Sequence, residues 1–227
     1  MKIDNDTLTY IRNVVETGQM VGIDDVIIET GKVRAINDEK SVVLFQDENV
    51  PEMQFNVGLN RINVFLSRLE VARTQENFAV SVLTDDNGEF ARSFTMTGKG
   101  FKVDYRCANP KTIRAPKAIA DELVHEIQLT AQAVYMLQKG QSAMGSDMVS
   151  LICNQEGISF EFVDANDDKF THQFTSEGSS ETFTYKYPIK ILLPLFKHDA
   201  ESTFKIGRKG MLNIVVNNLN IFVLPQV

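Results

Sequence analysis

Three histidines are the first candidates for acid–base catalysis or metal binding in this chain. His125, His172 and His198 lie far apart in the sequence, and none has a second His, Cys or acid at metal-ligand spacing. The Gly-x-Ser-x-Gly motif that presents a nucleophilic serine is also absent. These residue types and spacings predict no catalytic centre and no metal site, so we expect a protein without enzyme activity or cofactor.

Two further stretches share some features with ligand-binding loops. TGKGFKV, residues 97–103, lacks the remainder of a phosphate-binding loop, and a glycine-rich hairpin turn explains it better. DANDDK, residues 164–169, is acidic like a calcium loop, but the glycine and the distal glutamate of such loops are missing. We interpret the second stretch as an acidic turn.

The composition is typical of a soluble globular protein. The 227 residues are 43% hydrophobic and 23% charged, no apolar stretch approaches the length of a membrane span, and the N-terminus lacks a secretion signal. Cys107 and Cys153 sit in strand-like runs and are expected to be buried thiols rather than a disulfide. We therefore expect a cytoplasmic protein, in a host cell if it is viral, with no membrane partner.

The net charge of −7 by itself argues against binding that depends on neutralising many phosphates. Surface charges are largely screened beyond about 8 Å in physiological salt. A locally basic face can therefore coexist with an acidic remainder, and the positions of the cations matter more than their total.

Four short segments have apolar residues at helical spacing. They cover residues 7–18, with Asp6 as N-cap and Gly18 as the stop, 60–72, 130–140 with Gly140 as the stop, and 188–199. Pro188 is tolerated at the start of the last helix, whereas Pro194 inside it is expected to bend or shorten it.

Most of the remaining sequence alternates like β-strands joined by Asn and Gly turns, which is typical of antiparallel hairpins and meanders. The predicted strands lie in residues 78–86, 89–98, 101–108, 147–157, 158–168, 169–175, 182–187, 201–207, 211–218 and 219–226. Strands do not alternate with long helices, so a doubly wound α/β fold is not expected.

The two halves of the chain follow one plan. Residues 22–46 and 145–174 both follow a helix, begin Gly-x-Asp and run strand–turn–strand. Each is followed by another strand and then by the second helix of its half. Between the halves, ANPKTIRAPKAIADE contains two prolines and few strand formers, which indicates an extended linker. We predict two domains, residues 1–107 and 121–227, joined by a linker at 108–120.

The order of these segments resembles the DNA polymerase sliding clamps of the proliferating-cell-nuclear-antigen type. DMVSLICNQEGISFEF, residues 147–162, is similar to the hairpin of that family's second domain, and IFVLPQ, residues 221–226, resembles its Tyr-Leu-Ala-Pro ending. In length the chain is most like the clamps of large tailed bacteriophages. The resemblance implies an α+β fold of two similar clamp domains, each with antiparallel sheets and two short helices, and three chains closing into a ring.

The same resemblance implies a processivity factor that encircles duplex DNA and tethers the replicative polymerase and other client proteins. The helices would line the hole, and they carry cations off their apolar stripes: Arg12, Arg61, Arg68, Lys139, Lys190 and Lys197. Arg61 and Arg68 are seven residues apart, as are Lys190 and Lys197, so each pair lies on one side of its helix. The alternative for any one of them is an ordinary solvated cation, and Glu16 and Glu70 lie on the same helices.

Ring closure needs two sheet edges that pair between subunits. By the resemblance these are residues 101–107 and 168–175, with the contact residues Phe101, Val103, Tyr105, Phe170, His172 and Phe174. The alternative is that both segments are internal strands of one sheet.

In the clamp family, short peptides of the polymerase, the clamp loader and other clients bind an apolar pocket beside the linker. Carried over by position, that pocket would comprise Ile36, Val42, Ile113, Ala115, Pro116, Phe222, Leu224 and Pro225. The sequence departs from the family here, because Ile36-Asn37 replaces Met-Asp and Leu224 replaces a smaller alanine. The alternative to this pocket is that Phe222 and Leu224 close the core and that Pro225 ends the strand.

Two other functions stay open from the sequence. The first is a β-rich structural or assembly protein of a phage, built of duplicated domains. The second is a small-molecule-binding or enzymatic β fold. A closed ring of fixed stoichiometry distinguishes the clamp from both.

Overall fold

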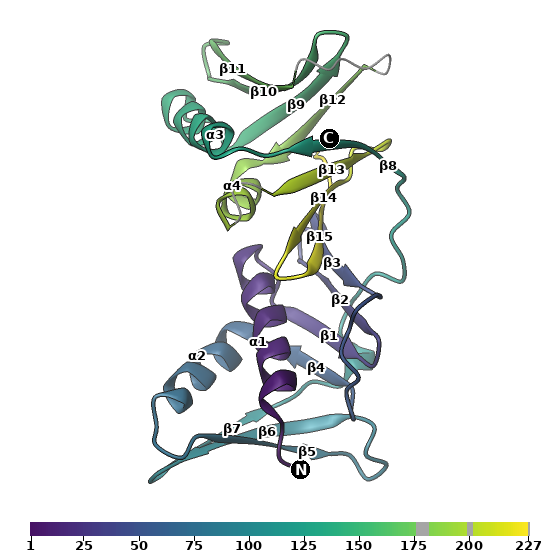
Figure 1. Cartoon of the computed structure of the whole chain (residues 1–227), viewed down its shortest axis with the longest axis vertical. Helices are drawn as coiled ribbons and strands as arrows, with labels where there is room; N and C mark the ends of the chain where they lie inside the picture. Colours follow the sequence, from purple (N-terminus) through teal and green to yellow (C-terminus); the bar gives the residue numbers. More distant parts are fainter. Residues whose placement is uncertain (176–181, 199–201, 227) are drawn as a thin grey trace. The chain divides into compact units, whose positions relative to one another are not determined.

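The structure is a computed structural model that describes residues 1–175, 182–198 and 202–226. The chain divides into two compact units, Met1–Ile119 (unit 1) and Ala120–Val227 (unit 2). Each unit contains two helices and antiparallel strands (Figure 1). The expected α+β class is thereby confirmed.

The four predicted helices are all present: α1 (Asn5–Met20), α2 (Ile62–Arg73), α3 (Ala131–Met144) and α4 (Ile189–His198). Several of their ends differ from the prediction. Helix α1 does not stop at Gly18 but continues to Met20. Asp4, not Asp6, caps α1, because its carboxylate accepts hydrogen bonds from the Thr7 backbone N–H and hydroxyl, both at 2.8 Å. These bonds lower the pKa of Asp4.

A further difference is at Gly140, which lies inside α3 rather than ending it. The helix continues to Met144 and ends at Gly145, whose φ of +60° is the left-handed conformation of a helix stop. A Cβ added to Gly140 would lie 2.6 Å from Cδ1 of Phe170 and 2.7 Å from Cδ2 of Phe162. The glycine is therefore present because two phenylalanines of the sheet pack directly against the helix backbone.

Unit 1 contains two sheets, and the bounds of their strands are β1 (Asp25–Glu29), β2 (Lys32–Ile36), β3 (Val42–Gln46), β4 (Val57–Asn60), β5 (Ala79–Thr84), β6 (Ala91–Gly98) and β7 (Phe101–Arg106). The strand order is β4-β1-β2-β3 in one sheet and β5-β6-β7 in the other, and every pairing is antiparallel. A short 3-10 turn, η1 (Pro110–Thr112), follows β7. The predicted strand before the second helix is β4, whereas the sequence analysis missed this turn.

Unit 2 contains β8 (Leu123–Gln128), β9 (Met148–Asn154), β10 (Gly157–Val163), β11 (Lys169–Thr175), β12 (Phe183–Pro188), β13 (Thr203–Gly207), β14 (Leu212–Val216) and β15 (Leu219–Val223). The strand order is β11-β10-β9-β12 in one sheet and β15-β14-β13-β8 along the other. Pro188 ends β12 and α4 begins at the next residue, so the proline precedes the helix instead of opening it.

The two units repeat one topology, as the sequence predicts. In unit 1 the strand before the second helix, β4, pairs back with β1, and in unit 2 β12 pairs back with β9 in the same way. Strands β1, β2 and β3 thus correspond to β9, β10 and β11, and β5, β6 and β7 correspond to β13, β14 and β15. Where β8 pairs with β13 in unit 2, residues 1–3 bond to β5 in unit 1.

Each helix pair packs on a core of aromatic rings. In unit 1, Phe65 of α2 meets Phe94 and Tyr105 edge-on, with ring centroids 5.4 and 5.1 Å away. In unit 2, Phe196 of α4 lies 5.2 Å from Phe204, and both are fully buried. Within each unit the two helices contact one another, so they are held together on one side of their sheets. No helix in the described part of the chain is long and apolar enough to cross a membrane.

Candidate nucleic-acid interface and assembly edges

Arg61 and Arg68, the predicted DNA-facing pair of α2, both lie over the ring of Tyr105. Each guanidinium carbon is 6.0 Å from the ring centroid, within the range of a cation–π contact. Arg61 is the N-cap residue of α2 in the left-handed conformation, with φ of +57°, and its side chain makes no capping bond. Arg68 also donates from Nη1 to the backbone carbonyl of Asp104 at 2.8 Å. The two cations are therefore positioned by β7 as well as by their helix.

Tyr105 is the residue that joins these elements. Its side chain is fully buried, and its hydroxyl donates to the backbone carbonyl of Asn60, at the entry to α2. Burial raises the pKa of this phenol well above its ordinary value. The prediction that Tyr105 contacts a second subunit is therefore wrong for the side chain, because the ring belongs to the core of unit 1.

The remaining predicted cations lie on the other three helices. Arg12 of α1 forms an ion pair with Glu16 at 2.6 Å, one turn along the helix. Lys139 of α3 is exposed and lies 5.3 Å from the Tyr135 ring centroid. Lys190 and Lys197 are exposed on α4. Arg12 is thus paired with a carboxylate of its own helix.

The two predicted assembly segments are both outer strands, and they belong to different sheets. In the described chain β7 pairs with β6 alone, and β11 pairs with β10 alone. The alternative, two internal strands of one sheet, is wrong. At the opposite side of each small sheet the chain supplies extra bonds: Ile3 donates its N–H to Val80 of β5, and Gln226 donates its N–H to Lys186 of β12. Within the residues that the structure describes, each of these two sheets therefore has one outer strand bonded by a neighbouring backbone segment and one without such a backbone bond.

The backbone of β7 alternates between its partner and the open side. The N–H of Cys107 donates to the carbonyl of Arg92 beside β6, whereas the carbonyl of Asp104 accepts from Arg68. Residues of an antiparallel edge strand direct their N–H and C=O alternately to the two sides. Lys102, Asp104 and Arg106 consequently direct theirs away from β6.

The aromatic residues of β11 are committed mainly to their own unit. Phe170 packs against Gly140, and the Phe174 ring lies 4.2 Å from that of Phe160. His172 lies 5.6 Å from the Phe174 ring, and burial lowers its pKa. All three side chains are half-buried, as are Phe101 and Val103 of β7. An edge-to-edge contact here would therefore depend chiefly on backbone hydrogen bonds.

The residues carried over to a client-peptide pocket divide by exposure. Val42 is fully buried, Phe222 is 7% exposed, and Ile113 is buried against Gly58. Val42 cannot contact a peptide, so its assignment to the pocket is wrong. Ile36, Ala115, Pro116, Leu224 and Pro225 are partly exposed.

Asn37, which sequence reasoning treated only as a departure from the family, builds the loop after β2. Its Oδ1 accepts from the N–H groups of Ser41 and Val42, both at 2.9 Å, and its Nδ2 donates to the Ser41 hydroxyl at 3.0 Å. Asn37 is buried, and these bonds satisfy its amide. The signal in the sequence was the position itself, since Asn in a strand-to-strand turn commonly bonds nearby backbone.

The acidic stretch at 164–169 forms a closed turn. The carboxylate of Asp164 accepts from the N–H groups of Asn166 and Asp168 at 2.8 and 2.9 Å, which supports the interpretation as a turn. Among the described residues, no group of three or more His, Cys, Asp or Glu side chains could hold a metal ion. Both cysteines are free thiols; Cys153 is buried as predicted, whereas Cys107 is partly exposed. Burial nevertheless raises the pKa of Cys107 to about 12.

Comparison with known proteins gives a fold but no sequence family. No protein-family model matches the chain, and no curated protein sequence matches it. The chain is similar to Thermococcus kodakaraensis PCNA, with 14% identity and a TM-score of 0.62 over 100% of this chain and 99% of that one.

Two further solved structures contain bound partners. A. fulgidus PCNA, solved with the C-terminal region of FEN-1, has 13% identity and a TM-score of 0.62, over 95% of this chain and 94% of that one. The Helicobacter pylori beta clamp, solved with a DNA ligase peptide, has 12% identity and a TM-score of 0.64, over 99% of this chain and 66% of that one. Given these matches and the repeated topology, the chain has the fold of the DNA sliding clamps.

Proposed function

We propose that this protein is a DNA sliding clamp, a processivity factor that encircles duplex DNA and tethers the replicative polymerase and other clients. The observation that carries the proposal is the duplicated clamp fold, in which each unit joins a cation-bearing helix pair to a sheet with one open outer strand. In a clamp, helices with cations can face the DNA phosphates while the outer strands join neighbouring subunits, and this chain has both features.

The charge distribution fits a ring that slides. Each ion pair with a phosphate adds affinity and salt dependence, so a clamp held on DNA by topology benefits from few contacts. A net charge of −7 opposes adhesion elsewhere on the surface. The exposed cations of the helices, Arg61, Lys139, Lys190 and Lys197, are sufficient to centre the duplex without fixing it.

The assembly we propose is a homotrimer of about 76 kDa, built from three chains of 25.5 kDa. Strand β7 of one chain would pair with β11 of the next, which covers both open strands and removes an aggregation hazard. The match to 66% of the Helicobacter pylori clamp chain supports this stoichiometry, because a shorter chain needs more copies to complete a ring of equal domain number.

Clients would bind through short peptides. The solved clamps with a FEN-1 C-terminal region and a DNA ligase peptide support this part of the proposal. In this chain the partly exposed apolar residues Ile36, Pro116, Leu224 and Pro225 are the proposed contacts. A polymerase C-terminal peptide should lose affinity for a Leu224→Asp, Pro225→Ala variant that still assembles. Equal affinity for both proteins would remove the pocket from these residues.

The decisive experiment combines mass and topology. Light scattering should give a molar mass of about 76 kDa. After loading by a matched clamp loader, the protein should stay on closed circular DNA and should dissociate when the circle is cut. A strictly monomeric protein at tens of micromolar, or tight sequence-specific binding to a short linear duplex, would contradict the proposal.

The DNA-facing cations need a variant that leaves the edge strand intact. Arg68 also bonds Asp104, so we exclude it and combine Arg61→Ala, Lys190→Ala and Lys197→Ala. A matched control replaces three exposed cations of the strand regions, Lys99, Lys205 and Arg208. The helix variant should show reduced retention on circles and a shallower salt dependence, whereas the control should match wild type. The reverse result would place the DNA-facing surface elsewhere.

A further inference from the structure

Unit 1 has a cavity of about 500 Å³ that the proposed clamp function does not use. It lies where the end of β5, the start of β6 and the end of β7 meet, and its lining includes Leu83, Phe90, Arg92, Arg106, Cys107 and Pro110. The volume is within the range of sites that bind small molecules or side chains of peptides. None of these residues belongs to the helix cations or to the predicted client pocket, but Arg106 and Cys107 lie in the predicted assembly segment 101–107.

The floor of the cavity is apolar and open. Leu83, Ser93 and Arg106 are directly opposite one another across the three strands, so they form one row on the sheet. Leu83, near the end of the outer strand β5, is 63% exposed, so it presents apolar surface to solvent. Phe90 and Cys107 are half-buried beside it, and Pro110 is buried. A ligand with an aliphatic group would cover this surface.

The rim carries positive charge on an otherwise acidic protein. Arg106 is exposed and makes no ion pair with any residue that the structure describes, and Lys111 lies 5.7 Å from the Phe90 ring centroid. Arg92 pairs at 3.2 Å with Asp86, but the Asp86 side chain is 93% exposed and the pair is therefore weak. Asp85 uses a carboxylate oxygen to accept from the Phe90 N–H. Two guanidinium groups are thus available beside the apolar floor.

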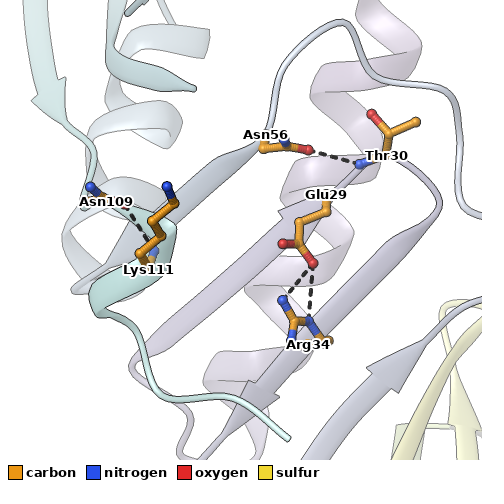
Figure 2. Close-up of polar contacts among 6 residues, drawn as sticks. All are labelled: Glu29, Thr30, Arg34, Asn56, Asn109 and Lys111. Carbon is orange, nitrogen blue, oxygen red and sulfur yellow. Dashed lines mark hydrogen bonds and ion pairs between the residues drawn. The ribbon is translucent and has the colours of Figure 1, made fainter. Parts of the chain in front are cut away.

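The wall formed by residues 107–111 is held in place by its own bonds. The N–H of Cys107 donates to Arg92 at 2.9 Å, and that of Ala108 donates to Gly58 at 2.9 Å. Asn109 accepts from the Lys111 N–H at 3.0 Å through its side chain and so fixes the turn η1 (Figure 2). The same view shows that the neighbouring Arg34 is occupied by Glu29, at 2.7 Å. A preformed wall lowers the entropic cost of binding.

We propose that this cavity is a second docking site, which takes a short acidic and aliphatic segment of a partner protein. An aliphatic side chain would lie on Leu83, Phe90 and Pro110, and a neighbouring carboxylate would pair with Arg106 and Arg92. Guanidinium groups bind carboxylates in a bidentate geometry, so the ion pair has a defined orientation as well as strength. Nucleic acid fits less well, because Asp85 and Asp86 stand at the same rim and the floor is apolar. The site lies within one unit, so the proposal does not depend on ring formation.

The test uses fluorescein-labelled peptides and the full chain. The sequence Glu-Asp-Leu-Leu-Asp-Glu should bind in fluorescence anisotropy at least about tenfold more tightly than versions with Ser for Leu or with Gln and Asn for the acids. Arg106→Glu should weaken binding at least about tenfold, and Leu83→Ser should also weaken it. Lys102→Glu is the matched control, because it reverses an exposed charge on the same strand outside the cavity.

Methyl NMR locates the peptide, and circular dichroism checks that each variant is folded. Chemical-shift changes should centre on Leu83, Ala91 and Ala108. Changes centred on Ile36 and Ile113 would place the peptide in the client pocket and overturn the proposal. No binding at about 1 mM, equal loss in Lys102→Glu and Arg106→Glu, or equal affinity for the serine peptide would also overturn it. So would binding confined to a monomeric variant, because a second copy of the chain would then fill the cavity.

Discussion

At the scale of single residues, several side chains of this protein have two tasks that the sequence cannot separate. Arg68 is a cation on a helix face and also a donor to the backbone of β7. The sequence predicts that Gly140 ends a helix, but in the structure Phe162 and Phe170 pack directly against it. Both roles arise from tertiary contacts with residues far along the chain, which local spacing does not encode.

The role of Gly140 gives the first prediction. Gly140→Val should destabilise unit 2 by about 1–3 kcal/mol, because the added atoms would overlap two phenylalanine rings and force them to move. Gln138→Val, on an exposed position of the same helix, should change the free energy of unfolding by no more than about 0.5 kcal/mol. Urea unfolding followed by circular dichroism measures both. An unchanged midpoint for Gly140→Val would mean that the rings do not contact the helix as described.

His172 gives a prediction about pH. Burial lowers its pKa below the ordinary 6.5, so the folded chain favours the neutral imidazole while the unfolded chain binds a proton more readily. The stability linked to this group is complete above pH 6.5 and is lost as the pH falls through that value toward the lower pKa of the folded state. Unfolding midpoints between about pH 7.5 and pH 5 should therefore fall less steeply in His172→Gln than in wild type. His198→Gln, at the exposed end of α4, is the control and should follow wild type.

At the scale of elements, helix α2 and strand β7 form one mechanical connection in unit 1. Tyr105 of the strand bonds the backbone at the start of the helix and lies beneath both of its arginines. The element that would face DNA and the element that would join a second chain are therefore held by the same side chain. The sequence prediction placed Tyr105 on the correct strand but assigned its side chain to a subunit contact instead of the core. Alternation alone does not say which residues of an edge strand face the core.

Removing one atom tests this connection. Tyr105→Phe should lower the free energy of unfolding by about 0.5–1.5 kcal/mol, since the hydrogen bond to Asn60 is lost while the ring remains. Tyr135→Phe removes the hydroxyl of an exposed tyrosine on α3 and should have little effect. If chemical denaturation shows equal changes in the two variants, the Tyr105 hydroxyl contributes no specific bond.

The edge of β7 can be blocked without disturbing the core. Lys102 directs its N–H away from β6, so Lys102→Pro should leave the fold intact while it removes a donor from the open side. We expect light scattering to show a shift from trimer to monomer with an unchanged circular dichroism spectrum. Lys102→Ala, which keeps the N–H, should remain trimeric. A trimeric Lys102→Pro would show that assembly does not use this strand.

At the scale of the whole molecule, the repeated topology is the feature that the sequence predicted best. Four helices, the hairpins and the strands β7 and β11 were found from periodicity and from the Asn and Gly turns, because these signals are local. That β7 and β11 are outer strands was implied by the resemblance to sliding clamps and not by periodicity. Strand β8 was missed, because it is short and adjoins the linker, where alternation is weak. The cavity at Leu83 was not foreseen either. It forms only when three strands align Leu83, Ser93 and Arg106, a register that no single segment reveals.

The two open outer strands have a consequence for mixtures of chains. Because β7 and β11 are different surfaces, any association between them is heterologous and directional: a growing series always keeps one unused strand of each kind until it closes. A chain with a blocked β7 can still accept a neighbour on β11 and so terminates the series. In a cell that makes both forms, such a chain would have a dominant-negative effect, because each blocked chain would inactivate more than one normal chain.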